Sequence, residues 1–310
     1  MNKYPWLVRV WNRNGDEYIL RPHVGTHGAC GGTIIASKYV LTAAHCVDKK
    51  NATGWFIRRH YAYELAVKVG DHKIQSDYDD NQGLPTRFVN IVKIIQHPDW
   101  NGSGKGHPHE GNDVAILELA EELDLVVYTP ACLAKASSGD KFNGKTAKAY
   151  GWGAISEIPW RSYPDDPYEI ELRVRRGLTE WMDEISPQCG GTVLCAGLNN
   201  LDRGICSVSR ESRCVFLATY LLLLVVLLPT CLQGDSGGPL TYKQGSQHIL
   251  IGVSSWGFGN TNGFNWITLS FSPKKCGAAS GFCRVSAVRD WMEGEMVHPV
   301  YCQGGPEADD

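Results

Sequence analysis

The chain has 310 residues, of which 43% are hydrophobic, 34 are glycine and 11 are cysteine. This is the composition of a globular protein, and the length allows one large all-β domain or two smaller ones. The 30 basic and 33 acidic residues give a net charge of -3 with no long run of one sign, which argues against a nucleic-acid-binding face.

The cysteine count is high for a cytosolic protein, and glycosylation sequons begin at Asn51 and Asn101 in polar stretches. Both features favour an extracellular, secreted protein. No apolar targeting core follows Met1, because residues 6–10 have the pattern of a strand. We therefore expect a signal peptide and a propeptide to be missing upstream.

Short apolar runs between turn signals recur along the chain, which is the pattern of β-barrels or sandwiches and not of βαβ units. Residues 121–130 are a candidate connection between two halves. The expected strands are residues 6–10, 32–35, 39–42, 66–69, 114–119 and 249–253.

One helix is expected near the end of the chain, over residues 285–296. Val285, Val288, Trp291 and Met292 recur there at helical intervals.

Three short segments carry residues suited to nucleophilic catalysis. His45 stands in the sequence LTAAHC, which taken alone is typical of a structural histidine. Asp113 precedes an apolar strand, where its carboxylate could orient a histidine. Ser236 lies in GDSGGP, whose glycines permit a tight turn in which the N–H groups of Gly234 and Ser236 converge, although a serine in a glycine-rich loop is also common.

Together these segments, in the order His, Asp, Ser, resemble the chymotrypsin (trypsin-like) family of serine proteases. The resemblance extends over nearly the whole chain and rests on several further motifs in family order. They are TAAHC at 42–46, DVAIL at 113–117, GWG at 151–153, LCAG at 194–197, GDSGGP at 234–239 and SWG at 255–257.

The resemblance implies an all-β fold of two six-stranded antiparallel barrels with a C-terminal helix. Residues 1–125 would form the first barrel, with His45 and Asp113, and residues 126–310 the second, with Ser236. It also implies an acyl-enzyme mechanism without a metal or other cofactor.

In this mechanism the hydroxyl of Ser236 attacks the scissile carbonyl, His45 transfers the proton and Asp113 holds the imidazole. The N–H groups of Gly234 and Ser236 form the oxyanion hole. Residues 255–257, that is Ser255, Trp256 and Gly257, would pair with the substrate backbone.

Family disulfides imply three bridges in this chain. The pairs are Cys30 with Cys46, Cys189 with Cys195, and Cys206 with Cys276. In two-chain relatives Cys132 would pair with a propeptide cysteine that this sequence lacks, so the partners of Cys132, Cys283 and Cys302 stay open.

The pattern departs from the family at two places. The family pairs a freed Ile-Val-Gly-Gly amine with the aspartate before the nucleophile, here Asp235, and this chain begins instead at Met1. Without that ion pair we expect a poorly formed oxyanion hole, so that activity of the chain as given is in doubt.

The second departure is residues 208–233, which separate Cys206-Ser207 from GDSGGP and include a leucine-rich run. A translated intron is the favoured explanation, and removing it restores CSGDSGGP. The alternatives are a surface loop and a membrane-inserting loop, and the apolar run is shorter than the roughly 20 residues of a spanning helix. A second insert is possible at about 260–275.

The resemblance places Gly204 at the floor of the specificity pocket and Gly257 and Gly281 at its walls. An uncharged floor and small walls predict a large apolar or aromatic residue on the amino side of the cleaved bond, the P1 position. Asp202 lies two positions from the floor, and a shift in register would favour Lys or Arg at P1 instead.

The resemblance implies protein or peptide substrates, an activating protease and protein inhibitors as partners, and neither nucleic acid nor a membrane. A non-catalytic homologue that binds proteins is the alternative function, although such homologues commonly lose one of the three catalytic residues, all of which are present here.

Overall fold

The computed structural model describes residues 3–13, 28–50, 56–73, 86–101, 111–153, 164–175, 189–197, 235–258 and 279–297. Within these ranges the protein consists of β-strands, short 3-10 turns and one α-helix. The two possible inserts, at 208–233 and about 260–275, lie outside them. No helix in the described part of the chain is long and apolar enough to span a membrane.

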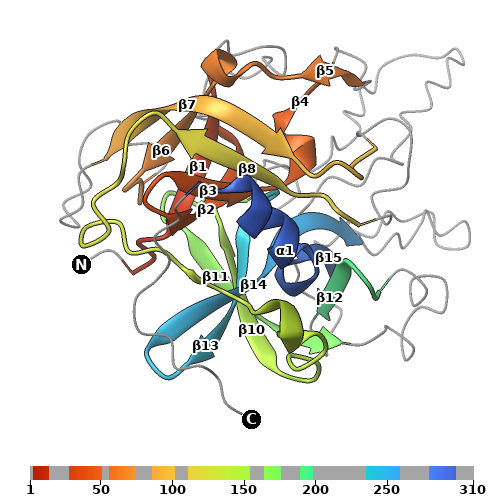
Figure 1. The fold of residues 1–310 in the computed structure, drawn as a ribbon. Helices are drawn as coiled ribbons and strands as arrows, with labels where there is room; N and C mark the ends of the chain where they lie inside the picture. The colour runs from red at the N-terminus through yellow and green to blue at the C-terminus, as the bar shows by residue number, and fades with distance from the viewer. Residues whose placement is uncertain are drawn as a thin grey trace, which may run out of the picture.

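Six strands close the first barrel in the order β1-β2-β3-β8-β7-β6, seen in red to yellow in Figure 1. Their bounds are β1 (Leu7–Asn12), β2 (Gly28–Ala36), β3 (Tyr39–Thr42), β6 (Leu65–Val69), β7 (Arg87–Gln96) and β8 (Ala115–Leu119). A separate hairpin joins β4 (Asp48–Lys50) to β5 (Phe56–Arg59).

The second barrel is closed by the pairing of β13 with β14. Its strands are β10 (Thr146–Gly151), β11 (Tyr168–Arg175), β12 (Val193–Gly197), β13 (Pro239–Gln244), β14 (Gln247–Phe258) and β15 (Ala279–Arg284), and the short β9 (Cys132–Leu133) adds to β14 in parallel. The expected pair of six-stranded barrels is confirmed. We propose that the boundary between the two barrels lies between residues 125 and 126.

The strands follow from the residue pattern of the sequence. In β7, Val89 and Ile91 are buried while Phe88, Asn90 and Val92 are exposed, which is the period of two expected for a half-buried strand. All four residues of β3, which pairs with β2 and β8, are buried.

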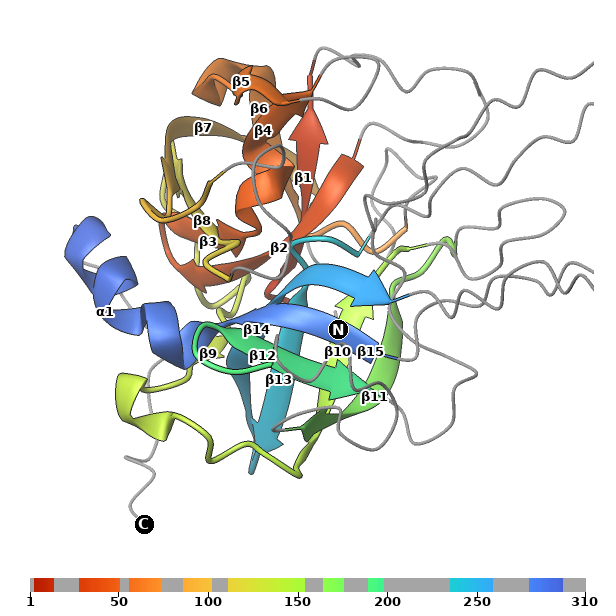
Figure 2. The ribbon, with the colours of Figure 1, turned by 90° about the vertical axis from the view of Figure 1, so that its right-hand side faces the viewer.

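The single helix, α1 (Val285–Glu295), ends one residue before the end predicted from the sequence. Val285, Val288 and Met292 are buried on one face of it. The ring of Trp291 lies 4.7 Å from that of His97, between ring centroids, so that α1 reaches the first barrel (Figure 2).

The segment before β1 also links the two barrels. The ring of Tyr4 packs on Tyr150 of β10 at 4.7 Å between centroids, and its hydroxyl donates to Glu169 of β11 at 2.6 Å. Burial and the hydrogen bond to Glu169 raise the pKa of Tyr4 above its usual value.

A buried carboxylate, Glu64, fastens the β4–β5 hairpin to the first barrel. Arg58 of β5 donates to both of its oxygens at 2.7 Å, Lys49 of β4 lies 3.2 Å away, and the N–H of Tyr61 donates at 2.8 Å. The hydrogen bonds from Arg58 are the largest reason why the pKa of Glu64 lies well below its usual range.

Candidate active site

His45 is placed by a disulfide and by the turn that follows β3. It lies in the 3-10 turn η1 (Ala44–Val47), where Cys46 is bonded to Cys30 of β2 with a Cα–Cα distance of 6.0 Å. Because this bridge fastens η1 to β2, the histidine has a fixed position on the first barrel. Its side chain is 18% exposed, so the ring remains accessible.

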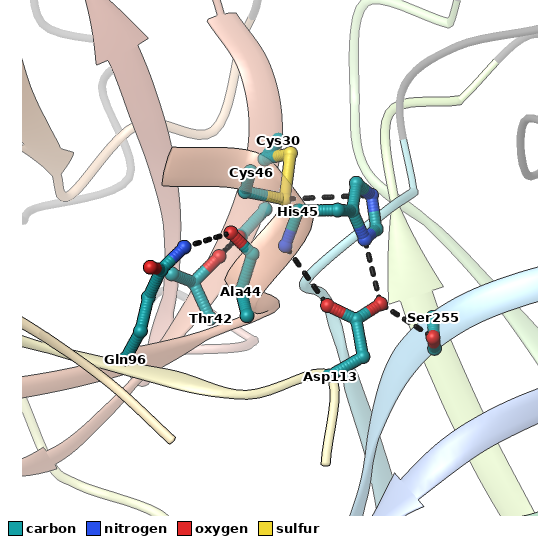
Figure 3. Close-up of a disulfide and its surroundings, with 9 residues drawn as sticks. Cys30, Thr42, Ala44, His45, Cys46, Gln96, Asp113 and Ser255 are labelled. Atoms are coloured by element: carbon teal, nitrogen blue, oxygen red, sulfur yellow. Dashed lines mark hydrogen bonds and ion pairs between the residues drawn. A yellow bond between two sulfur atoms is a disulfide. The ribbon is translucent and has the colours of Figure 1, made fainter. Parts of the chain in front are cut away.

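Asp113 is buried and contacts His45 at two atoms (Figure 3). Its Oδ1 accepts the main-chain N–H of His45 at 2.9 Å, and its Oδ2 lies 2.7 Å from Nδ1 of the ring. Ser255 of β14 donates to Oδ2 at 2.5 Å. A residue of the second barrel therefore helps to hold the carboxylate of the first.

These contacts determine the charge of Asp113. Burial by itself raises the pKa of the carboxyl, but the charge of His45 and the hydrogen bonds from His45 and Ser255 outweigh it, so that the pKa lies below its usual value. An ionised Asp113 holds the ring with a proton on Nδ1 and leaves Nε2 as the basic nitrogen.

A bulge in β14 aims Ser255 at Asp113. The pairing of β14 with β15 shifts by one residue between Ser254 and Trp256. A bulge of this kind redirects the side chain of the extra residue, here Ser255, away from the regular alternation of the strand.

The backbone at Ser236 is fixed to both barrels. Its carbonyl accepts from the N–H of Gly31 at 2.8 Å, and the N–H of Gly237 donates to Ser254 at 2.7 Å. Gly237 has a φ of 77°, and a Cβ there would lie 2.5 Å from the carbonyl oxygen of Gly31 and 3.1 Å from the nitrogen of Ala43. Only glycine fits this close approach to the segment that leads to His45.

The main chain at Ser236 and Gly237 therefore lies next to the segment that leads to His45. Within the described residues no hydrogen bond joins the side chains of Ser236 and His45, and none uses the N–H of Ser236. Catalytic hydrogen bonds often form fully only when substrate is bound. Gly234, the other expected oxyanion donor, lies outside the described residues.

The carboxylate of Asp235 is enclosed by the GWG segment. The N–H of Gly153 donates to its Oδ1 at 2.8 Å. A Cβ on Gly151 would lie 2.0 Å from Oδ1, and a Cβ on Gly153 would lie 2.2 Å from Oδ2. The two glycines leave the space that this carboxylate occupies.

The expected substrate-binding strand lies along the second barrel. Ser255, Trp256 and Gly257 are in β14, and Gly281 lies opposite Trp256, whose ring occupies the place of a Cβ on Gly281. The residue paired with Gly257 is Ser280. Gly204, the expected pocket floor, lies outside the described residues, as does Asp202.

Two of the expected disulfides are confirmed, Cys30–Cys46 and Cys189–Cys195. Cys206 and Cys276 lie outside the described residues. Cys132, whose partner the sequence leaves open, is disulfide-bonded.

Cys283 is a free, buried thiol. Burial, followed by the negative charge of Asp113, raises its pKa far above the usual value, which keeps it protonated and unreactive.

Sequence reasoning missed two polar residues near this site. Ser280 is buried, and its hydroxyl has no hydrogen-bond partner among the described residues. Gln96, at the end of β7, donates to the carbonyl of Ala44 at 2.9 Å. Neither stands in a recognisable motif, and only the strand register brings them to the site.

Comparison with known proteins gives one family match. The family model described as Trypsin matches residues 1–207 and 230–291, which leaves one internal segment, residues 208–229, and the end of the chain from residue 292 unmatched. The internal unmatched segment falls within the possible insert at 208–233.

Among curated relatives, chymotrypsin-like elastase family member 1 of Bos taurus is 25% identical over 302 residues, covering 96% of this chain and 86% of the relative. CLIP domain-containing serine protease B4 of Anopheles gambiae is 26% identical, covering 94% of this chain and 67% of the relative. Serine protease Hayan of Drosophila melanogaster is 30% identical, covering 74% of this chain and 31% of the relative.

Proposed function

Because the chain belongs to the trypsin family of serine proteases, we propose that it is an endopeptidase in which His45, Asp113 and Ser236 form the catalytic triad. The observation that carries the proposal is the two-point contact of Asp113 with His45, at 2.9 and 2.7 Å. The contact of Gly237 with the segment before His45 supports the placing of Ser236 beside the same ring.

In the proposed mechanism Nε2 of His45 removes the hydroxyl proton of Ser236 as the oxygen attacks the peptide carbonyl. Asp113 stabilises the imidazolium that forms, and the N–H of Ser236, together with that of Gly234, stabilises the oxyanion. Collapse of the tetrahedral intermediate transfers the proton from His45 to the leaving amine and gives an acyl-enzyme. Water, activated by His45, then hydrolyses the ester and restores Ser236.

We propose that the substrate binds as an extended strand along residues 255–257 of β14, with its P1 side chain beside Gly257. An apolar or aromatic P1 residue is the preference to test first, because Gly257 is small and the expected floor, Gly204, is uncharged. Ser280, which pairs with Gly257, is also small and uncharged. Lys or Arg at P1 is the competing specificity.

We propose that the protein acts outside the cell, where its disulfides are stable. We also propose that another protease activates the protein and that protein inhibitors control it. The absence of a family match to residues 208–229 supports the hypothesis that residues 208–233 are not part of the functional enzyme. A non-catalytic role is not favoured, since all three proposed catalytic residues are present.

The experiment is digestion of a diverse peptide mixture, with the cleavage sites identified by mass spectrometry. We expect cleavage after aromatic and large apolar residues, and no cleavage by the Ser236→Ala variant. Cleavage after Lys and Arg would establish the competing specificity. Identical peptide patterns with the wild-type chain and the variant would contradict the proposed activity.

A further inference from the structure

The peptide group that joins Ala44 to His45 is hydrogen-bonded at both of its polar atoms to side chains. Its N–H donates to Oδ1 of Asp113 at 2.9 Å, and its carbonyl oxygen accepts from Nε2 of Gln96 at 2.9 Å (Figure 3). Rotation of this peptide plane would weaken both bonds at once and would turn the backbone that carries the imidazole.

The two side chains that hold the peptide come from neighbouring strands. Gln96 is the last residue of β7 and pairs with Ala115 of β8, two residues after Asp113. One residue further on, the N–H of His97 donates to the carbonyl of Val114 at 3.1 Å. The strand pairing therefore fixes Gln96 and Asp113 relative to each other.

The orientation of the Gln96 amide is determined by its contacts. Nε2 also donates to Oδ1 of Asp48 at 2.7 Å, while Oε1 accepts from Arg59 at 2.5 Å. The other oxygen of Asp48, a buried carboxylate, accepts from Trp100 at 3.0 Å. Because Nε2 faces two acceptors and Oε1 faces a donor, a flipped amide would lose all three bonds.

We propose that Gln96 is a positioning residue for His45, an inference that rests on the proposed function. It acts through the Ala44 carbonyl, which it holds so that the following N–H stays directed at Asp113 and the imidazole stays in register with Ser236. The charge of Asp48 strengthens this arrangement, since hydrogen bonds to an ionised acceptor are stronger than neutral ones. Catalysis is sensitive to such positioning, because a displacement of about 1 Å can cost about 100-fold in rate.

The test compares two variants of nearly the same shape as glutamine. Gln96→Met removes both donors, and Gln96→Glu keeps the oxygen that faces Arg59 but turns the donor into an acceptor. Lys93→Met, at an exposed position of the same strand, is the matched control. The measurement is the rate of labelling of the full chain by a fluorophosphonate, at temperatures where circular dichroism shows each variant to be folded.

We expect both Gln96 variants to be labelled about 10- to 100-fold more slowly than the wild type. The Lys93→Met variant should be labelled at the wild-type rate. Wild-type rates in both folded Gln96 variants would overturn the proposal. If these variants do not fold, Asp48→Asn decides, because it keeps one acceptor oxygen for Gln96 and removes the charge, together with the second oxygen, which accepts from Trp100. The proposal predicts slower labelling than in Lys93→Met, and an equal rate would overturn it.

A second readout does not depend on Ser236. The proton on Nδ1 of His45, shared with Asp113, should give a low-field proton NMR resonance that Gln96→Met shifts or broadens and Lys93→Met leaves in place. An unchanged resonance in Gln96→Met would overturn the proposal. Absence of wild-type labelling together with a resonance that responds to Gln96 would instead count against the proposed protease activity alone.

Discussion

Asp113 holds His45 by its main chain as well as by its ring, since Oδ1 accepts the backbone N–H at 2.9 Å and Oδ2 lies 2.7 Å from Nδ1. The same carboxylate that selects the ring tautomer therefore also fixes the backbone from which the ring projects. Ser255 adds a third contact from the second barrel, so that the position of the ring depends on how the two barrels meet.

Replacing Asp113 with Asn tests this contact. The amide keeps the shape of the carboxylate but no longer favours a proton on Nδ1, so the basic nitrogen would no longer face Ser236. We expect fluorophosphonate labelling to slow by about 10⁴-fold, as in the general serine protease mechanism. Labelling near the wild-type rate, in a variant with unchanged melting temperature, would contradict the role given to Asp113.

The glycines around Asp235 give a second prediction. In Gly153→Ala the new Cβ would lie 2.2 Å from the carboxylate of Asp235, which forces the residue before Ser236 to move. We expect a loss of about 100-fold in labelling rate. Gly294→Ala is the control, because a Cβ there meets nothing within 4 Å in α1. It should leave the rate unchanged and stabilise the protein by up to about 1 kcal/mol.

The disulfide beside His45 gives a third prediction. Replacing Cys30 and Cys46 together with Ala opens a loop with a sequence separation of 16. The free energy of unfolding, measured in urea, should fall by about 3 kcal/mol. Because the bridge fastens η1 to β2, labelling should also slow at temperatures where the variant is folded. A stability equal to that of the wild type would contradict the structural role of this bridge.

Glu64 gives a prediction about pH. Its hydrogen bonds from Arg58 keep its pKa below the usual value in the folded state, so its stabilising contribution is present above pH 4 to 5 and is lost as the pH falls further. The substitution Glu64→Gln should lower the free energy of unfolding by about 2 kcal/mol at pH 7, measured by urea unfolding. The difference between wild type and Glu64→Gln should shrink below about pH 4. A difference independent of pH would show that the charge of Glu64 does not matter.

The fifth prediction concerns the segment at 208–233. The test is a deletion of these residues that joins Ser207 directly to Gly234. The junction restores the sequence CSGDSGGP, and the family match already omits residues 208–229. We expect the shortened chain to be labelled at least about 10-fold faster than the full chain, because a correctly formed oxyanion hole is worth at least that much. A slower rate in the shortened chain would show that the segment contributes to the enzyme.

The sequence is informative about the site wherever the contacts are local or come from a motif. The strands follow from apolar runs between turns, and Cys30–Cys46 and Cys189–Cys195 follow from the family pattern. Pairing across strands is harder to predict. The bulge at Ser255 shifts β14 against β15 by one residue, which puts Ser280 opposite Gly257.

Contacts between distant polar residues could not be predicted for a related reason. Gln96 reaches Ala44 across a separation of 52 residues, and its place depends on the register of β7 with β8. No periodic pattern marks a glutamine at the end of a strand as different from any other polar residue. The same holds for Glu64, whose partners come from the β4–β5 hairpin.

The most direct test of the proposed triad is to treat the full chain with a fluorophosphonate and to locate the adduct by peptide mass spectrometry. We predict a single adduct on the oxygen of Ser236, absent from the His45→Ala variant, because only a histidine oriented by Asp113 makes that hydroxyl nucleophilic. An unmodified Ser236, or equal modification in wild type and His45→Ala, would contradict the claim that these residues form one catalytic unit.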